Sequence, residues 1–195
     1  MTETDPFERF ALEYERASAS EDFEASRCAL GTADGKGRPS VRFVLLKGFD
    51  ARGFVFYTNF GSVKAAHLEL NPHAEMAFHW HTTGVQVRVR GTVEKVSDEE
   101  ADAYFASRDR GSQIGAWASK QSEVLDARES LEAAVREAAC RFENVSVPRP
   151  PNWGGYRIIP ASIEFWYNHD DRLHDRWLFE RDGAGPEWRV VRLYP

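Results

Sequence analysis

The chain has 195 residues, a formal net charge of −6 and a hydrophobic share of 42% that includes 13 Phe. This composition suits one packed domain over residues 1–195 and argues against disorder, and the acidic balance gives no general attraction to nucleic acid or anionic membranes. No apolar run reaches the length of a membrane span, the N-terminus lacks a signal-peptide core, and the two cysteines have no CxxC spacing, so a cytoplasmic location is expected.

The first half of the chain is expected to begin with a helix over residues 5–19. Asp5 can cap this helix and Pro6 suits its first position. Apolar residues recur along one face at helical spacing: Phe7, Phe10, Ala11 and Tyr14. The pattern then predicts strands over residues 27–32, 41–47 and 54–59, followed by a helix over residues 61–70 that ends before Asn71-Pro72.

The second half continues with strands over residues 74–81 and 85–96. The latter alternates, so Val85, Val87 and Val89 should face the core while Gln86, Arg88 and Arg90 face the other way. A capping box at Ser97 predicts a helix to Ser107, and residues 111–120 form a loop or short helix. The longest helix is expected over residues 122–142, with a buried stripe at Val124, Leu131, Val135, Ala138 and Phe142. A Pro-rich crossing at residues 147–155 leads to strands over residues 156–167, 172–180 and 188–194.

The strands follow one another mostly in hairpin order. This order predicts a mainly β fold with α, an antiparallel barrel of about seven strands with helices packed outside, and not a parallel doubly wound sheet. Neither a P-loop nor a GxGxxG motif is present. His79 and His81 share one face of a strand, but no third ligand has metal-site spacing, so no metal is predicted.

Residues 41–65 combine cations with strand ends and a helix start. Arg42 and Lys47 flank an apolar strand, and Lys64 lies in the first turn of the next helix. Cations beside a helix N-terminus are typical of an anion site, and a buried Lys47 ammonium needs an anion or a polar partner. In a regular strand Arg42 and Lys47 point to opposite faces, which suits two ligands better than one.

A second candidate site lies at the sequence RLHDR. On a strand Arg172, His174 and Arg176 would point the same way, and two guanidiniums beside an imidazole are unfavourable unless an anion lies there. Trp166, just upstream, could stack on a flat ring. Two residues one helical turn apart can also converge on one object: Tyr104 and Arg108. Together these residues predict a pocket for a phosphorylated planar ligand.

Six segments carry a resemblance to a known family: RFVLLKGFD, FYTNFGSVKA, SRDRGSQIGAWASKQS, PPNWGGYRI, IEFW and RLHDR. In this order and at these separations the chain resembles pyridoxamine 5′-phosphate oxidases from about Asp5 to Pro195. The resemblance implies an FMN-binding split β-barrel that works as a homodimer, with two FMN sites at the subunit interface.

The resemblance also implies roles for individual residues. Within one subunit, the FMN phosphate would be bound by Arg42 and Lys64, and the ribityl chain and phosphate would lie near Tyr57, Thr58 and Ser62. The backbone of Val44 and Leu45 would run beside the flavin, and Gln86 would contact the isoalloxazine ring. Contacts from the partner subunit would come from Gln121, Ser122, Trp166 and Arg176. The substrate phosphate would be bound by Lys47, Tyr104, Arg108 and Ser112. Arg172 and His174 would lie over the pyridine ring as the catalytic pair, Arg172 polarising it and His174 orienting it.

Three features depart from the family pattern. Val63 and Val85 stand where the family usually has Arg, and Arg88 is a candidate replacement at the flavin phosphate. Four residues precede Asp5, so we expect no long basic arm closing over the substrate.

The expected function is an FMN-dependent oxidase that converts pyridoxamine 5′-phosphate or pyridoxine 5′-phosphate to pyridoxal 5′-phosphate, with O2 as acceptor and hydrogen peroxide as product. One alternative is a flavin oxidase of the phenazine-biosynthesis type, which acts on tricyclic substrates. Another is a split-barrel protein that binds FMN or a vitamin phosphate without turnover. The phosphate-binding set of Lys47, Tyr104, Arg108 and Ser112 favours the vitamin substrate.

Overall fold

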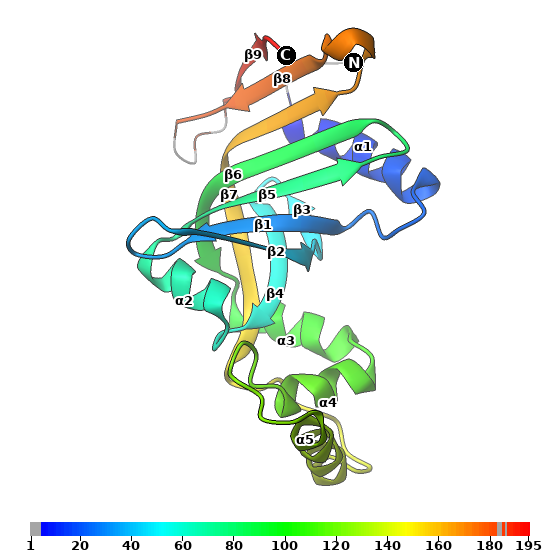
Figure 1. Cartoon of the computed structure of the whole chain (residues 1–195), viewed down its shortest axis with the longest axis vertical. Coiled ribbons are helices and arrows are strands. Elements are labelled where there is room, and N and C mark those ends of the chain that lie inside the picture. The colour runs from blue at the N-terminus through cyan, green and yellow to red at the C-terminus, as the bar shows by residue number, and fades with distance from the viewer. Residues whose placement is uncertain (1–4, 183–184, 186) are drawn as a thin grey trace.

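The computed structural model describes residues 5–182, 185 and 187–195, which form a curled sheet with helices around it (Figure 1). The strands are β1 Arg27–Ala33, β2 Pro39–Leu45, β3 Gly48–Asp50, β4 Gly53–Asn59, β5 His73–Trp80, β6 Val85–Lys95, β7 Trp153–Tyr167, β8 Asp175–Glu180 and β9 Arg189–Leu193. The helices are α1 Pro6–Ser20, α2 Val63–Leu70, α3 Asp98–Ser107, α4 Arg110–Ala118 and α5 Arg128–Arg141, with a 3₁₀ turn, η1, at Asp170–Arg172.

All strand pairs are antiparallel, in the order β2-β1-β5-β6-β7-β4-β3, with β8 joining β7 to β9. β7 changes partner along its length, because its first half pairs with β4 and its second half with β8. The β6–β7 register shifts between Arg90 and Gly91, where a Cβ on Gly91 would lie 1.9 Å from the carbonyl oxygen of Ile159. A side chain does not fit there, and the bulge bends the sheet into a half-barrel.

The predicted mainly β, antiparallel fold with helices is confirmed. The described residues hold nine strands where about seven were expected, and the three-residue β3 lies in the predicted turn. Both predicted caps are present: the Asp5 carboxylate accepts from the Phe7 N–H, and the Ser97 hydroxyl accepts from the Glu100 N–H. Each cap satisfies a backbone donor that the first turn of a helix leaves free.

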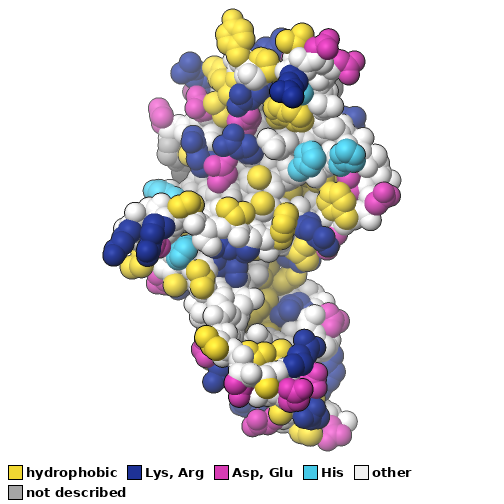
Figure 2. All heavy atoms as spheres, viewed as in Figure 1, with side chains coloured by type: hydrophobic (Ala, Val, Ile, Leu, Met, Phe, Trp, Pro, Cys, Tyr) yellow, Lys and Arg dark blue, Asp and Glu magenta, His cyan; other side chains and the backbone are white. Residues whose placement is uncertain are grey.

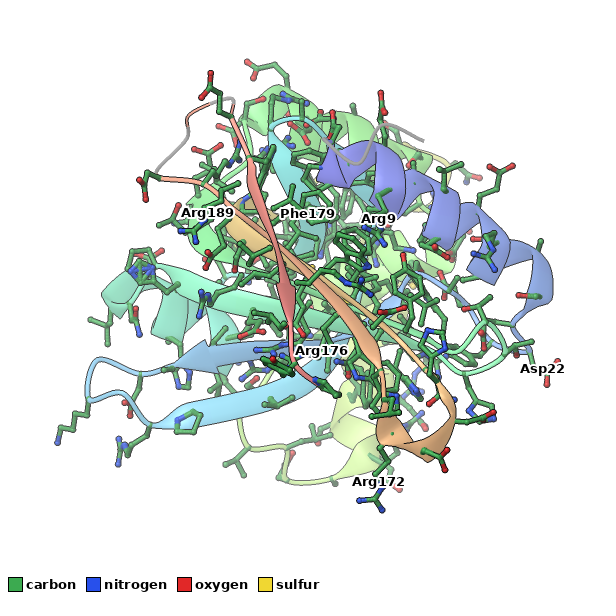
Figure 3. All side chains as sticks on the ribbon, turned by 90° about the horizontal axis from the view of Figure 1, so that it is seen from above. Arg9, Asp22, Arg172, Arg176, Phe179 and Arg189 are labelled. Atoms are coloured by element: carbon green, nitrogen blue, oxygen red, sulfur yellow. The ribbon has the colours of Figure 1, made fainter. Side chains whose placement is uncertain are left out.

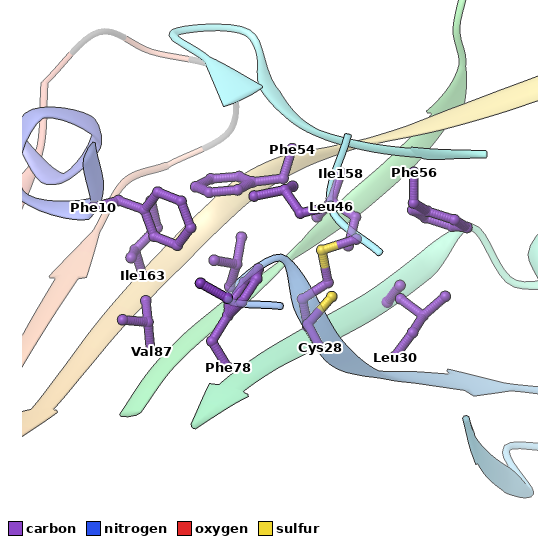
Figure 4. Packing of buried hydrophobic residues seen from close by; sticks show 14 of the residues in the cluster. Phe10, Cys28, Leu30, Leu46, Phe54, Phe56, Phe78, Val87, Ile158 and Ile163 are labelled. Carbon is purple, nitrogen blue, oxygen red and sulfur yellow. The ribbon is translucent and has the colours of Figure 1, made fainter. Parts of the chain in front are cut away.

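The main core lies on the inner face of the curled sheet, against α1 (Figure 4). Phe10 of α1 is fully buried, with its ring centroid 4.8 Å from that of Phe54 and 5.2 Å from that of Phe78. The predicted alternation in β6 is confirmed, since Val85, Val87 and Val89 are buried and the polar residues that alternate with them face outward. Burial of this aromatic cluster holds α1 on the sheet, and a Phe10→Ala change is expected to cost about 3–5 kcal/mol.

A second, smaller core joins α3, α4 and α5 into a lobe at the end of the sheet (Figure 1). The helix predicted over residues 122–142 begins only at Arg128, and with 14 residues it is shorter than α1, which has 15. Its predicted buried stripe is wrong at Val124, which lies in the preceding loop and is fully exposed, and at Val135, which is exposed on the helix. The stripe is confirmed at its end, where Ala138 and Phe142 are buried.

Residues 146–152 cross from α5 to β7 without a helix or strand, so the predicted Pro-rich crossing is present, but β7 begins at Trp153, three residues earlier than expected. None of the helices in the described ranges is both long and apolar enough to cross a membrane. The organisation of residues 1–195 as one domain stays a prediction.

Candidate functional site

A cavity of about 810 Å³ lies where the curled sheet faces the lobe of α3–α5. Its walls come from β2 and β4, the start of α2, the ends of α3 and α4, and the loop after α4. β2 and β4 do not pair with each other in the described sheet, so the barrel stays split on this side. In Figure 2 the molecule narrows at this level, and Lys and Arg side chains lie at the narrow part.

The charge of this cavity is one-sided. Among the described residues its lining holds no Asp or Glu and four cations: Arg42, Lys47, Lys64 and Arg108. Lys47 lies 3.6 Å from the Glu24 carboxylate, which is outside the lining, whereas the other three form no ion pair with any described residue. The expected burial of Lys47 is wrong, since this residue is exposed, but Lys64 is buried and Arg42 and Arg108 are partly buried. Because charges withdrawn from water are normally paired, these three cations indicate an anionic ligand.

Of these cations, Arg108 gives the most direct indication of an anionic ligand. Its guanidinium lies 4.8 Å from the ring centroid of Trp153, and its buried Nη1 has no hydrogen-bond partner among the described residues. Burial also lowers the pKa of Arg108. A buried donor without a partner costs about 1–3 kcal/mol, which an anion bound at Nη1 would remove.

The predicted neighbours of Arg108 line the same cavity. The Tyr104 and Tyr57 rings stack with centroids 3.9 Å apart, and Tyr57 stacks in turn on Trp153 at 5.4 Å. Burial raises the pKa of Tyr57 to about 12, so its hydroxyl stays protonated at neutral pH. Ser112 completes the group from a different helix, α4, because the chain leaves α3 at Arg108 and starts a new helix at Arg110.

Lys64 lies at the other end of the cavity, in the first turn of α2. Its ammonium donates to Thr58 Oγ1 and to Gln121 Oε1, both at 3.0 Å. Burial, and then the nearby charge of Arg42, lower the pKa of Lys64 to about 8. An anion bound beside this amine would restore its affinity for a proton.

Arg42 points into the cavity from β2. Its Nη1 donates to the Leu30 carbonyl at 3.0 Å and to Thr32 Oγ1 at 2.7 Å, and its Nη2 donates to Ser40 Oγ at 2.7 Å. All three acceptors are neutral, and burial lowers the pKa of Arg42. Its charge is therefore held in place by hydrogen bonds but not neutralised.

The prediction that Arg42 and Lys47 point to opposite faces of a strand is wrong. β2 ends at Leu45, so the strand alternation does not reach Lys47, and both cations line the one cavity. Val44 and Leu45 between them line it too.

Three further cofactor residues fall at the start of α2. Ser62 is fully buried and caps the helix, with its hydroxyl accepting from the Ala65 N–H at 3.4 Å. Gln121 and Ser122 reach the cavity within the same chain, because Gln121 contacts Lys64 and the Val63 N–H donates to Ser122 Oγ at 3.4 Å. The prediction that both come from a partner subunit is wrong for these contacts.

The remaining predicted residues form a second group, away from the cavity, on the outer face of the sheet. Gln86, Trp166 and Arg176 are neighbours across β6, β7 and β8, and the His174 ring lies 4.3 Å from that of Trp166. Arg176 is neutralised by Glu164 at 2.8 Å. None of these residues lines the cavity of the described chain.

Arg172 belongs to this group but not to a strand. β8 begins at Asp175, and Arg172 closes the η1 turn with a left-handed φ of 61°. The prediction that Arg172, His174 and Arg176 project together from a strand is therefore wrong. Figure 3 shows Arg172 at the tip of the turn, directed away from the molecule, with Arg176 further along β8.

Arg88 does not replace the arginine missing at Val63. It pairs with Glu75 at 2.6 Å and with Glu164 at 3.2 Å, and it is not part of the cavity lining. Val63 does line the cavity, so a fifth cation is absent from a position that faces the ligand.

Trp153 and Thr32 are site residues that sequence reasoning did not identify. Trp153 forms the floor under Arg108, and Thr32 holds Arg42. The motif PPNWGGYRI contains the tryptophan, and alternation along β1 places Thr32 on the buried side, so both signals were present.

His79 and His81 have ring centroids 6.2 Å apart. In the ranges that the structure describes, no group of three or more His, Cys, Asp or Glu side chains could hold a metal ion.

Comparisons with known proteins match most of the chain to one family. Residues 18–141 match the family model of pyridoxamine 5′-phosphate oxidase, and residues 153–195 match that of the pyridoxine 5′-phosphate oxidase C-terminal dimerisation region. The pyridoxine/pyridoxamine 5′-phosphate oxidase of Rubrobacter xylanophilus is 53% identical over 98% of this chain and 87% of its own, and that of Chelativorans sp. strain BNC1 is 54% identical over 98% and 91%.

Solved structures show the same fold. PhzG from Burkholderia lata 383, in complex with tetrahydrophenazine-1-carboxylic acid, superposes with a TM-score of 0.93 at 32% identity, covering 100% of this chain and 94% of its own. A pyridoxamine 5′-phosphate oxidase-related, FMN-binding protein from Nostoc punctiforme gives a TM-score of 0.78 at 19% identity, covering 98% of both chains. By sequence and by fold, the chain belongs to the pyridoxamine 5′-phosphate oxidase family.

Proposed function

We propose that this protein oxidises pyridoxamine 5′-phosphate or pyridoxine 5′-phosphate to pyridoxal 5′-phosphate, with O2 as acceptor and hydrogen peroxide as product. The general class of the enzyme, an FMN-dependent oxidoreductase of vitamin B6 metabolism, follows from membership of the family. The proposal includes a cytoplasmic location, which suits the two unpaired cysteines, Cys28 and Cys140.

The residues around the α2 end of the cavity fit FMN. Arg42 and Lys64 would bind its phosphate beside the start of α2, with Thr58, Gln121 and Ser122 as hydrogen-bond partners. When bound, FMN supplies the redox chemistry by accepting a hydride from the substrate carbon and passing electrons to O2. The chain's own part is to bind both molecules, hold them in contact and place positive charge near the flavin.

The observation that carries the substrate assignment is the buried Nη1 of Arg108, which has no partner among the described residues, in a cavity whose described lining holds no carboxylate. A substrate phosphate would satisfy this donor, with further contacts from Lys47, Tyr104 and Ser112. The stacked rings of Tyr104, Tyr57 and Trp153 form an aromatic wall next to it. A phosphorylated aromatic amine or alcohol matches both features.

The second group of residues enters the proposal through a homodimer, which the C-terminal dimerisation match supports. Trp166 and Arg176 would reach the flavin of the partner subunit, and Arg172 and His174 would lie over the substrate ring. Gln86, on the same outer face, would contact the isoalloxazine ring. Arg172 is exposed on the turn before β8, where it is free to enter a neighbouring site.

The direct test is hydrogen peroxide release by purified protein with each of the two phosphorylated vitamers, with and without added FMN. We expect yellow protein and peroxide release in both cases. An Arg172→Ala variant should lose most of its turnover while FMN stays bound, and an Arg90→Ala variant, which changes an exposed arginine outside the cavity, should retain it. Colourless protein that does not bind FMN would contradict the proposal. Yellow protein without turnover would indicate a binding protein instead.

A second candidate function is a phenazine-type flavin oxidase, which the TM-score of 0.93 to PhzG favours. Such a tricyclic substrate carries a carboxylate instead of a phosphate, and it would offer the four cations of the cavity fewer acceptor oxygens. Peroxide release with a reduced phenazine carboxylate, and none with either vitamer, would favour this candidate.

A further inference from the structure

A histidine lies behind the arginine that faces the α2 end of the cavity. Thr32 Oγ1, which accepts a hydrogen bond from Arg42 Nη1 at 2.7 Å, lies 3.1 Å from His67 Nδ1. Thr32 is buried and His67 is half-buried, so water competes little for these groups. The three side chains come from β2, β1 and α2 and form one continuous line.

The direction of each hydrogen bond follows from the donors available. A guanidinium has no acceptor, so Arg42 must donate to Thr32. The single hydroxyl proton of Thr32 is then free for His67 Nδ1, which accepts it if the ring is neutral and carries its proton on Nε2. A proton on Nδ1 would instead turn two donors toward the Thr32 oxygen and leave the buried hydroxyl proton without an acceptor among the described residues.

The hydrogen bonds from Arg42 through Thr32 to His67 connect the two cations at the α2 end of the cavity, Arg42 and Lys64. Lys64 and His67 lie on the same helix, one turn apart, while Arg42 lies on β2. Arg42 and Lys64 carry like charges and repel each other, and this repulsion adds to burial in lowering the pKa of Lys64. The hydrogen bonds from His67 on α2 through Thr32 therefore oppose the separation of Arg42 and Lys64. They also direct the Arg42 guanidinium into the cavity.

We propose that His67 is a positioning residue that acts through Thr32 to hold Arg42 in place for the phosphate of FMN. The assignment rests on the proposed function, because it takes FMN as the anion. His67 itself does not line the cavity, so its effect must pass through the hydrogen bonds.

The first experiment compares binding of FMN and of riboflavin, which lacks the phosphate, to apoprotein variants by quenching of flavin fluorescence. His67→Leu should weaken FMN binding about 3- to 10-fold, the effect of one lost hydrogen bond, and leave riboflavin binding unchanged. His67→Gln, which keeps an acceptor, should restore most of the FMN affinity. His73→Leu, at an exposed histidine at the start of β5, is the matched control.

A double-variant cycle separates positioning from general damage. If His67 acts through Thr32, adding His67→Leu to Thr32→Val should cause no further loss of FMN affinity. Equal losses for FMN and riboflavin, or additive losses in the double variant, would overturn the proposal and leave His67 a structural residue.

A measurement without ligand keeps this inference distinct from the proposed function. The ¹⁵N shifts of the neutral His67 ring should show the Nε2–H tautomer in the wild type and a changed tautomer population in Thr32→Val. The Nδ1–H tautomer in the wild type would overturn the proposal even if FMN binds. A wild type that binds neither flavin would contradict the proposed function and with it the role at FMN, while the tautomer would still decide whether His67 holds Thr32.

Discussion

Two groups of arginines in this molecule differ in how their charge is neutralised. On the outer face of the sheet, Arg88 and Arg176 share Glu164, at 3.2 and 2.8 Å, and Arg88 also binds Glu75. In the cavity, Arg42 and Arg108 form no ion pair with any described residue. Both groups look alike as sequence, since each places arginines on or next to β-strands. The position of the carboxylates, and not the number of cations, marks the place where an anion binds.

The largest expected effect comes from removing an unneutralised charge. Arg108→Ala should lower kcat/KM for pyridoxamine 5′-phosphate about 10- to 100-fold, because a hydrogen bond between charged groups contributes about 1.5–3 kcal/mol. FMN affinity should not change. Steady-state peroxide release measures the effect, with unphosphorylated pyridoxamine as the control substrate, whose slow turnover should be unaffected. An equal loss with both substrates would place Arg108 outside the phosphate site.

The pKa of Lys64 gives the next prediction. It falls from 10.5 to about 8 in the folded chain, so the ammonium that attracts phosphate is lost as the pH rises through about 8. FMN affinity should therefore fall about 10-fold from about pH 7.5 to about pH 9.5. Lys64→Arg, which does not titrate in this range, should flatten the profile. The same shift makes the folded apoprotein more stable as the pH rises from about 8 to 10.5, because the unfolded chain then binds more protons.

The neutralised group responds through stability instead of ligand binding. Glu164→Gln removes the shared partner of Arg88 and Arg176 and should lower the free energy of unfolding by about 1–2 kcal/mol, since both arginines are partly exposed. Glu69→Gln, in an exposed pair with Lys95, should change it by less than about 0.5 kcal/mol. Urea unfolding of the FMN-free protein measures both. An unchanged free energy of unfolding in Glu164→Gln would break the distinction between the two groups.

The smallest expected effect comes from adding a charge to the cavity. Val63 lines the cavity and is 47% exposed, at the first position of α2. Val63→Arg should bind FMN about 3-fold more tightly, as expected of a partly solvated charge contact. Val63→Gln is a neutral control of similar length. No gain from Arg over Gln would show that Arg42 and Lys64 already saturate the phosphate.

Much of the fold could be predicted because local patterns agree with the final structure. The Asp5 cap, the alternating valines of β6 and the Pro-rich crossing each appear as expected. The start of α5 could not be placed, because residues 121–127 have helix-forming composition but are held by contacts of Gln121 and Ser122 with α2, far away in sequence.

The site was predictable where its residues lie on the same strand or helix turn. The prediction failed where the chain turns. Tyr104 and Arg108 converge as their spacing indicates. Strand alternation, applied to Lys47 and Arg172, gave wrong directions because each lies just outside its strand. The neutralisation of Arg88 depends on the pairing of β6 with β5 and β7, which strand patterns do not specify.

The change of partner along β7 has a consequence for the order of assembly. The second strand that pairs with β4 is formed by residues 153–158 of β7, about a hundred positions later in the chain. During synthesis the strands β1 to β6 must therefore exist with an open edge, exposed to pairing with other chains, until β7 emerges. The binding cavity is complete only after that late strand has inserted, so the last third of the chain governs when the first third can bind a ligand.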